Sequence, residues 1–189
     1  MHKRVLSPHS HAHTHTGGEF FLWPASLVLT DYLFRNPSLV HDRNVLELGS
    51  SHGLVAMAAR AVGAHRVLAT DKQDSSGFLS QNIAANSAHQ VEVAALDWGI
   101  DMEAWGAQHG WEWDIVLGSD LTFNRDCFLP LLLTLQQLVS RTHLSAMNAT
   151  NLQSDNHVRR ILLLHDDDRY QASCPYCEHF QKKIGDMLV

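Results

Sequence analysis

Hydrophobic residues from about position 24 onwards form short apolar runs that alternate with longer segments at helical spacing. The short runs predict strands at 45–48, 66–70, 91–96, 113–118 and 160–164, and the longer segments predict helices at 24–34, 54–62, 78–86 and 128–139. Strands that alternate with helices pair in parallel through right-handed crossovers, which cover both faces of the sheet. The expected fold class is therefore α/β, with a doubly wound, mostly parallel sheet.

Polar stretches interrupt this pattern at the beginning of the chain and towards its end. Residues 1–18 are polar and end in two glycines, so we expect an N-terminal arm followed by one folded domain over residues 19–189. The segment 142–157 is rich in Asn, Ser and Thr, which predicts an irregular insertion. A last helical stretch is expected at about 178–187.

Composition and charge narrow the classes of protein. Fourteen Lys and Arg residues against 20 Asp and Glu residues give a formal net charge of -6, which argues against nucleic-acid binding through a positive field. Neither a membrane span nor a signal peptide is expected, because the chain has no 18-residue apolar run and no hydrophobic leader. Three cysteines are too few for a secreted disulfide scaffold. We therefore expect a soluble cytoplasmic protein, with the nucleus as a second location and without nucleic-acid or membrane partners; the oligomeric state stays open.

Polar residues follow the predicted strands at their carboxyl ends, where ligands bind in an open parallel sheet. Gly49 ends the first strand, and Asp71 ends the second about 20 residues later. A carboxylate at this place can accept hydrogen bonds from both hydroxyls of an adenosine ribose. We favour a nucleoside-containing cofactor. The alternative is that Gly49 and Gly53 only form a tight turn and that Asp71 is a solvated strand end.

The turn after the first strand distinguishes two kinds of nucleoside cofactor. A dinucleotide-binding turn has the pattern G-x-G-x-x-G. The corresponding residues here are Gly49, Ser51 and Leu54, of which only the first is glycine. The run E-L-G-S-S-H-G at 47–53 fits the pattern E-x-G-x-G-x-G instead, with Ser51 at the middle glycine position.

With this turn and four further motifs, the chain resembles the seven-strand methyltransferases that use S-adenosylmethionine, and more narrowly the family-16 group of protein lysine methyltransferase-like proteins. The motifs are G-G-E-F-F-L-W-P-A-S at 17–26, V-L-E-L-G-S-S-H-G-L at 45–54, A-T-D at 69–71, L-D-W-G at 96–99 and D-I-V-L-G-S-D-L-T-F at 114–123. The resemblance covers about residues 17–140. It implies a Rossmann-like sheet and S-adenosyl-L-methionine as the cofactor.

The resemblance also implies a set of cofactor-binding residues. Glu47, Gly49 and Gly53 would line the methionine part of the cofactor, and Asp71 would hold its ribose. Two tryptophans of the set would flank the cofactor as apolar walls, with ordinary core packing as the alternative. The complete expected set is Trp23, Glu47, Gly49, Ser51, Gly53, Asp71, Lys72, Asp97, Trp98 and Ser119.

Asp120 and Phe123 are the expected catalytic residues, because the segment from 120 to 123 matches the family's D-x-x-Y motif beside the methyl donor and the substrate. Methyl transfer is a direct displacement, so the protein has to align and desolvate the reactants. A lysine amine must arrive uncharged, although its ordinary pKa of about 10.4 keeps it protonated at neutral pH. We expect Asp120 to orient this amine, and the expected partner is a protein substrate.

Three features keep other functions open. Ser51 replaces a glycine, Phe123 lacks the hydroxyl of the family's tyrosine, and the chain ends without the family's final antiparallel strand pair, which would leave the sheet edge open. One alternative is a methyltransferase-like protein that acts as an interaction module. A small-molecule N-methyltransferase is another, and a nicotinamide-dependent oxidoreductase is disfavoured by Leu54.

Two groups of potential metal ligands fall outside the expected site. Four histidines alternate along the N-terminal arm, so an extended chain would present them on one face: His9, His11, His13 and His15. Cys174 and Cys177 form a C-x-x-C pair, but no second pair at zinc-site spacing accompanies them. We interpret these groups as a polar arm and two ordinary cysteines, and expect no metal site.

Overall fold

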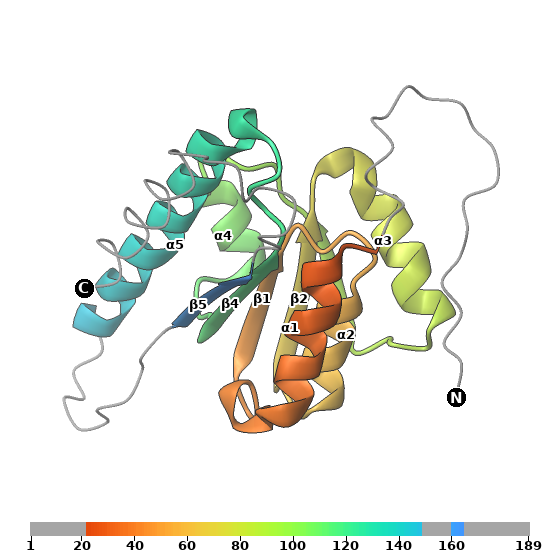
Figure 1. The fold of residues 1–189 in the computed structure, drawn as a ribbon. Coiled ribbons are helices and arrows are strands. Elements are labelled where there is room, and N and C mark those ends of the chain that lie inside the picture. The colour runs from red at the N-terminus through yellow and green to blue at the C-terminus, as the bar shows by residue number, and fades with distance from the viewer. Residues whose placement is uncertain (1–21, 149–159, 165–189) are drawn as a thin grey trace.

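The computed structural model describes residues 22–148 and 160–164 of the chain (Figure 1). Its strands are β1 (Asn44–Leu48), β2 (Arg66–Asp71), β3 (Val91–Ala95), β4 (Ile115–Ser119) and β5 (Arg160–Leu164). Its α-helices are α1 (Pro24–Arg35), α2 (Leu54–Ala61), α3 (Gln73–Ala85), α4 (Glu103–His109) and α5 (Phe128–Asn148). Two short 3-10 helices are η1 (Pro37–Leu39) and η2 (Arg125–Cys127).

The five strands form one sheet in the order β3-β2-β1-β4-β5, and every pairing is parallel. This confirms the predicted doubly wound α/β fold. The chain adds β2 and β3 on one side of β1 and then crosses to β4 and β5 on the other side. The strand order therefore reverses between β1 and β4, which is where ligands bind in sheets of this kind.

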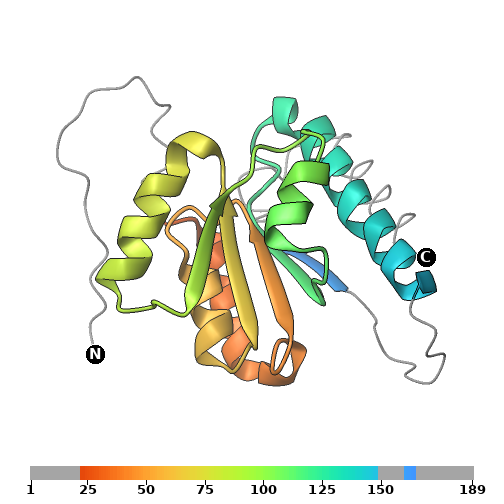
Figure 2. The same ribbon diagram turned by 180° about the vertical axis from the view of Figure 1, so that it is seen from behind.

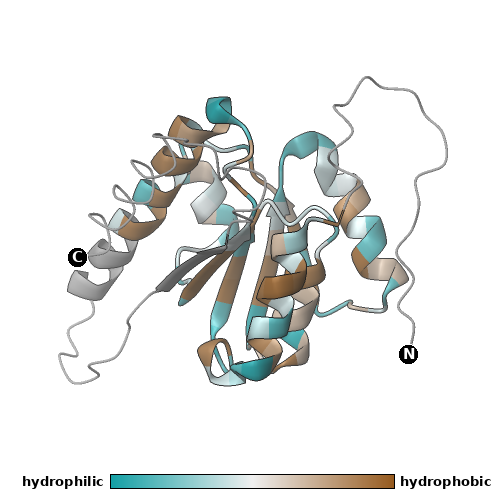
Figure 3. Cartoon of the chain, in the orientation of Figure 1, coloured by the Kyte–Doolittle hydropathy of each residue, from teal (hydrophilic) through white to brown (hydrophobic). Residues whose placement is uncertain are grey.

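Two hydrophobic cores lie on opposite faces of the sheet. Helices α1, α2 and α3 cover one face, and α4 and α5 cover the other (Figures 1 and 2). Successive strand residues point to opposite faces, so Val45 packs in the first core and Leu46 in the second. Because β1, β2 and β4 are buried on both faces, they have no polar face, and β1 and β4 are coloured mainly as hydrophobic in Figure 3.

Helix α4 was not predicted from the sequence. It has only seven residues, of which Trp105 and Gly106 are buried, and so it shows little helical periodicity. The indole nitrogen of Trp105 donates a hydrogen bond to the carbonyl of Ala95 at the end of β3. This tertiary contact attaches the short helix to the sheet.

Two other predicted boundaries were wrong. Helix α3 begins at Gln73 and not at Phe78. The prediction missed its first turn because that turn is polar and carries no apolar periodicity. Asp74 in this turn suits the positive end of the helix dipole. Helix α5 continues to Asn148, through the first part of the insertion predicted at 142–157. No glycine or proline interrupts residues 142–148, so the Ser and Thr residues there do not end the helix.

Some predictions concern residues outside the described ranges. They are the N-terminal arm with its histidines, the Cys174 and Cys177 pair, and the helical stretch at 178–187. Within residues 22–148 and 160–164, no helix is long and apolar enough to cross a membrane. The same part of the chain contains no group of three or more His, Cys, Asp or Glu side chains arranged to hold a metal ion.

Candidate functional site

A cavity of about 540 Å³ lies at the carboxyl ends of the strands, beside the point where the strand order reverses. Its volume falls in the usual range of small-molecule sites, about 300–1,000 Å³. Of the residues predicted to form the site, the following line it: Trp23, Gly49, Ser51, Asp71, Lys72, Asp97, Trp98, Ser119, Asp120 and Phe123. The fold thus brings together residues that are up to 100 positions apart in the chain.

The turn between β1 and α2 forms the floor of the cavity. Gly49 and Gly53 have φ values of 62° and 71°, and Ser51 between them has a φ of 47°. The turn therefore has the left-handed backbone conformation that glycine favours. Ser51 adopts this conformation at a cost in backbone strain, because it carries a side chain. The side-chain hydroxyl of Ser51 lies 3.1 Å from Nδ1 of His52, which is buried beneath the turn.

Asp71 is fixed at the end of β2 by two backbone amides. The amide of Ser51 donates to its Oδ2 at 2.7 Å, and the amide of Lys72 donates to its Oδ1 at 2.8 Å. A carboxylate oxygen can accept more than one hydrogen bond. At the neighbouring strand end, Asp97 accepts a hydrogen bond from the amide of Gln73 at 3.2 Å. Two oriented carboxylates therefore line the β2 and β3 side of the cavity.

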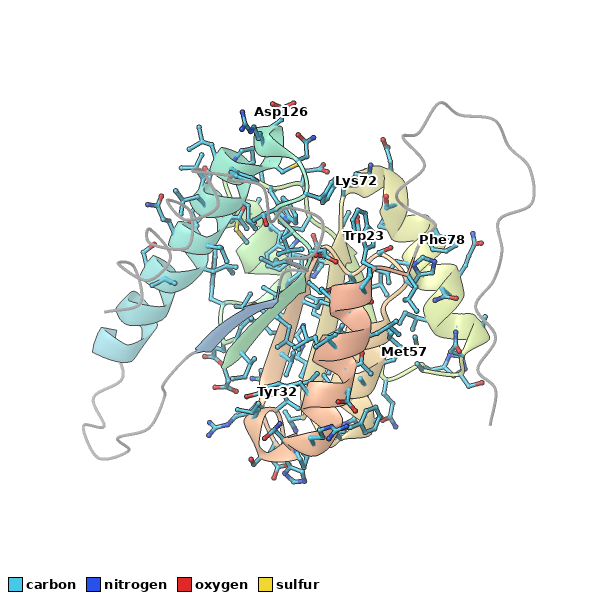
Figure 4. All side chains as sticks on the ribbon, viewed as in Figure 1. Trp23, Tyr32, Met57, Lys72, Phe78 and Asp126 are labelled. Atoms are coloured by element: carbon cyan, nitrogen blue, oxygen red, sulfur yellow. The ribbon has the colours of Figure 1, made fainter. Side chains whose placement is uncertain are left out.

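Aromatic rings form walls of the cavity. The rings of Trp23 and Phe123 have centroids 5.3 Å apart and planes tilted by 35°. Trp23 lies just before α1, near the strand ends where Lys72 is also labelled in Figure 4. Trp98 approaches Gly49, whose missing side chain makes room for the indole ring. Phe123 remains 48% exposed, so this ring pair lies at the surface end of the cavity.

Asp120 follows β4 and lines the cavity, although only 4% of it is exposed. Its φ of 54° is uncommon for a residue with a side chain. Its Oδ2 accepts a hydrogen bond from the amide of Ala25 in the first turn of α1, at 3.4 Å. The positive end of the α1 helix dipole faces this carboxylate. Asp120 therefore connects the segment that carries Trp23 to the end of β4.

Two residues of the predicted set do not line the cavity. Glu47 is buried in β1, and its Oε2 accepts a hydrogen bond from the amide of Ala56 in α2 at 2.9 Å. Gly53 precedes α2, and its α-carbon faces Leu79 and Ile83 of α3. Side chains alternate along a strand, so a residue such as Glu47 can match a cofactor-binding motif and still point under the turn. Both residues support the turn from behind.

Burial raises the pKa of Glu47 from an ordinary value of 4.5 to about 8, because its carboxyl group has no access to water. A raised pKa in the folded state means that Glu47 contributes stability below about pH 4.5, and that this contribution is lost as the pH rises through about 8. Between pH 5 and 8.5 the loss reaches up to about 4 kcal/mol.

Replacing Glu47 by Gln should remove this pH dependence, since Gln keeps an acceptor for the Ala56 amide and does not titrate. Urea unfolding of wild type and Glu47→Gln at half-unit steps between pH 5 and 8.5 measures the difference. We expect the variant to gain stability relative to wild type as the pH rises. Parallel stability curves over this range would contradict the prediction.

Gly49→Ala should damage both the fold and the cavity. An added methyl group would lie 2.8 Å from Cδ2 of Leu121 and 3.3 Å from the ring of Trp98, at a φ that disfavours side chains. We expect a loss of about 1–3 kcal/mol in the free energy of unfolding, measured with urea. Gly77→Ala is the matched control, because an added methyl group there meets no atom within 4 Å. Equal stabilities of the two variants would contradict the prediction.

Several lining residues were not identified from the sequence. They are Asp74, Ser75, Phe78, Leu96, Leu121, Asn124, Asp126, Cys127 and Pro130. Most belong to the first turns of α3 and α5 or to η2. Because the start of α3 was predicted at Phe78, its first turn was left out of the helix. The acidic residue shortly after the end of β2, Asp74, is a signal for a helix start that could have identified this turn.

A parallel sheet of this order, with a cavity at its carboxyl ends, places the chain in the class of Rossmann-like α/β proteins. Residues 7–161 match the family model described as "Lysine methyltransferase". The chain therefore belongs to the lysine methyltransferase family.

Curated relatives agree with this assignment. The chain is 32% identical over 149 residues to protein N-lysine methyltransferase METTL21A of Xenopus tropicalis, an alignment that covers 76% of this chain and 66% of that protein. It is 32% identical to protein-lysine methyltransferase METTL21E of Mus musculus, over 65% of this chain and 52% of that protein. It is also 32% identical to EEF1A lysine methyltransferase 3 of Xenopus tropicalis, over 62% of this chain and 51% of that protein. The chain thus spans about half to two thirds of the length of these relatives.

Among solved structures, the chain is similar to protein arginine methyltransferase 10 of Arabidopsis thaliana, with 18% identity and a TM-score of 0.46, over 58% of this chain and 31% of that one.

Proposed function

We propose that the chain binds S-adenosyl-L-methionine in this cavity and methylates a lysine side chain of a protein substrate. The observation that carries the proposal is that one cavity, in a member of the lysine methyltransferase family, brings together Asp71, Trp98 and Asp120 at the carboxyl ends of the strands, beside the point where the strand order reverses. The family description supplies the reaction and the acceptor type, and the cavity supplies groups that fit both reactants.

The cavity residues fit the cofactor. The Ser51 and Lys72 amides hold the Asp71 carboxylate, an acceptor group that suits ribose hydroxyls, and Gly49 leaves the space that a side chain would fill beside Trp98. Trp23 and Trp98 offer aromatic faces, which attract cations such as a sulfonium. When bound, S-adenosyl-L-methionine supplies an electrophilic methyl group.

The charge of the cavity suits a cationic acceptor. Among the residues that the structure describes, one basic side chain lines it, that of Lys72, against five carboxylates: Asp71, Asp74, Asp97, Asp120 and Asp126. A negative field raises the local concentration of cationic ligands. The field attracts the lysine as an ammonium, which must lose one proton to water before methyl transfer. The uncharged nitrogen would then form a bond to the methyl carbon as the bond from that carbon to sulfur breaks and S-adenosylhomocysteine leaves.

Asp120 and the Trp23–Phe123 ring pair align the acceptor in this proposal. The rings contact the alkyl part of the lysine and exclude water, while the carboxylate of Asp120 accepts a hydrogen bond from the amine and orients its lone pair. No covalent enzyme intermediate is needed. Cys127, a thiol lining the cavity, has its pKa raised by burial and by the nearby Asp126, which makes it a poor nucleophile.

The proposal includes the domain limits and location expected from the sequence. One methyltransferase domain spans residues 19–189 and follows an N-terminal arm at 1–18, and the protein acts in the cytoplasm on a protein partner. Three cysteines, too few for a secreted disulfide scaffold, support a reducing compartment. Fluorescence microscopy of the tagged chain tests it.

Two measurements test the proposed function in sequence. In a thermal-shift assay, S-adenosylhomocysteine should raise the melting temperature and NAD should not, because only a ligand of the native state stabilises it. Transfer of label from methyl-tritiated S-adenosylmethionine to proteins of a cell extract, followed by acid hydrolysis, should then yield labelled methyllysine. Stabilisation without labelled product in repeated extracts would favour an interaction module, and label only in small molecules would favour a small-molecule N-methyltransferase.

A further inference from the structure

The hydroxyl group of Ser75 is buried at the wall of the cavity without a hydrogen-bond partner among the described residues. Ser75 is 8% exposed and lies in the first turn of α3. Its backbone amide donates to the carbonyl of Lys72 at 3.0 Å, whereas its Oγ makes no hydrogen bond. Among the lining residues that the structure describes, no other buried side-chain oxygen or nitrogen atom has this property.

A buried hydroxyl without a partner destabilises a protein, because it has lost its hydrogen bonds to water and gained none in exchange. Such groups are rare in native proteins, and each calls for a physical reason. The position of Ser75 offers one, since the residue lines the cavity in which we place the cofactor. A polar atom of a ligand could accept the hydrogen bond that the free protein leaves unmade.

The order of the strands indicates which part of the ligand this atom belongs to. The proposed reaction centre lies at Asp120 after β4, the methionine part lies near Gly49 after β1, and the ribose lies on Asp71 after β2. Neighbouring strands are about 4.8 Å apart, so the same direction leads next to the end of β3. Asp97 and the first turn of α3 stand there, joined by the hydrogen bond from the Gln73 amide. The base of the cofactor therefore falls beside Ser75.

The two side chains at this end have complementary polarity for adenine. An ionised carboxylate only accepts hydrogen bonds, so Asp97 suits the exocyclic amino group. A hydroxyl can also donate, which suits a ring nitrogen. We propose that Ser75 donates a hydrogen bond to a ring nitrogen of the adenine base and is a cofactor-binding residue of this protein. The proposal rests on the proposed function, because it assumes an adenosine cofactor in this cavity.

Calorimetric titration of S-adenosylhomocysteine into wild type, Ser75→Ala and Ser76→Ala tests the proposal. We expect Ser75→Ala to raise the dissociation constant about 3- to 10-fold, the value of one hydrogen bond. Ser76→Ala is the matched control, because the Ser76 hydroxyl already donates to the Gln73 carbonyl at 2.9 Å, and Ser76 is not a lining residue. It should bind like wild type.

The melting temperature without ligand separates a binding role from a structural one. Removing a hydroxyl that has no partner should leave the melting temperature of Ser75→Ala equal to that of wild type or higher. A lower melting temperature together with weaker binding would assign Ser75 a structural role and overturn the proposal.

Analogues of S-adenosylhomocysteine that lack one ring nitrogen, the 1-deaza, 3-deaza and 7-deaza forms, identify the contact. For wild type, one of these analogues should have a higher dissociation constant than S-adenosylhomocysteine, by the same factor by which Ser75→Ala raises the dissociation constant of S-adenosylhomocysteine. For Ser75→Ala, that analogue and S-adenosylhomocysteine should have equal dissociation constants. An equal loss with every analogue would overturn the contact to a ring nitrogen. Wild-type affinity in Ser75→Ala would overturn the role of Ser75 alone, whereas a wild type that does not bind S-adenosylhomocysteine would overturn the proposed function as well.

Discussion

Replacing Asp71 by Ala should abolish measurable binding of S-adenosylhomocysteine, with a dissociation constant raised about 100- to 10,000-fold. The reason is that two charge-assisted hydrogen bonds to the ribose hydroxyls are each worth about 1.5–3 kcal/mol. The Ser51 and Lys72 amides hold the carboxylate in place before the ligand arrives, so little of this energy is spent on ordering it. Isothermal titration calorimetry measures the change.

Two variants control this experiment. Asp74→Ala removes another carboxylate from the same cavity, one that is exposed and lies on α3, and it should lower the affinity only slightly. Asp71→Asn keeps one acceptor oxygen and should fall between wild type and Asp71→Ala. If Asp74→Ala and Asp71→Ala weaken binding equally, the overall charge of the cavity holds the cofactor and Asp71 has no specific contact with the ribose.

Replacing Asp120 by Ala should lower methyl transfer at least about 100-fold while S-adenosylhomocysteine still binds, because a poorly oriented acceptor rarely reaches the reactive geometry. Turnover is measured as tritium incorporated into protein methyllysine, and binding is measured by calorimetry. The variant also loses the acceptor of the Ala25 amide, so we expect a loss of about 1 kcal/mol in the free energy of unfolding.

Asp120→Asn separates these two effects. Its side-chain oxygen can still accept from the Ala25 amide, but it carries no charge to orient the amine. We expect near wild-type stability and strongly reduced turnover. Full turnover in this variant would mean that Asp120 acts only by anchoring the first turn of α1, and it would remove the orienting role.

The hydrogen bond between Asp120 and Ala25 is a contact that could not be predicted from the sequence. The D-x-x-Y-like segment marked Asp120 as a site residue, but its partner lies 95 positions earlier in the chain. Contacts over such separations depend on how α1 packs against the sheet, and no local spacing encodes them. Glu47 shows the same limit in the opposite direction, because the motif marked it as a cavity residue and the structure buries it under α2.

The sequence by itself determined the architecture and the centre of the site. Apolar runs of strand length between helical segments require parallel strands that are buried on both faces. Gly49 and Asp71 mark two adjacent strand ends. A sequence pattern reveals these features because each arises within about 20 residues of chain. Only the tertiary structure decided which polar groups around that centre face the cavity. Ser75 and Asp126 carry no distinguishing local pattern, and they reach the cavity because α3 and η2 begin where the strands end. Packing, and not sequence spacing, sets the direction of these side chains.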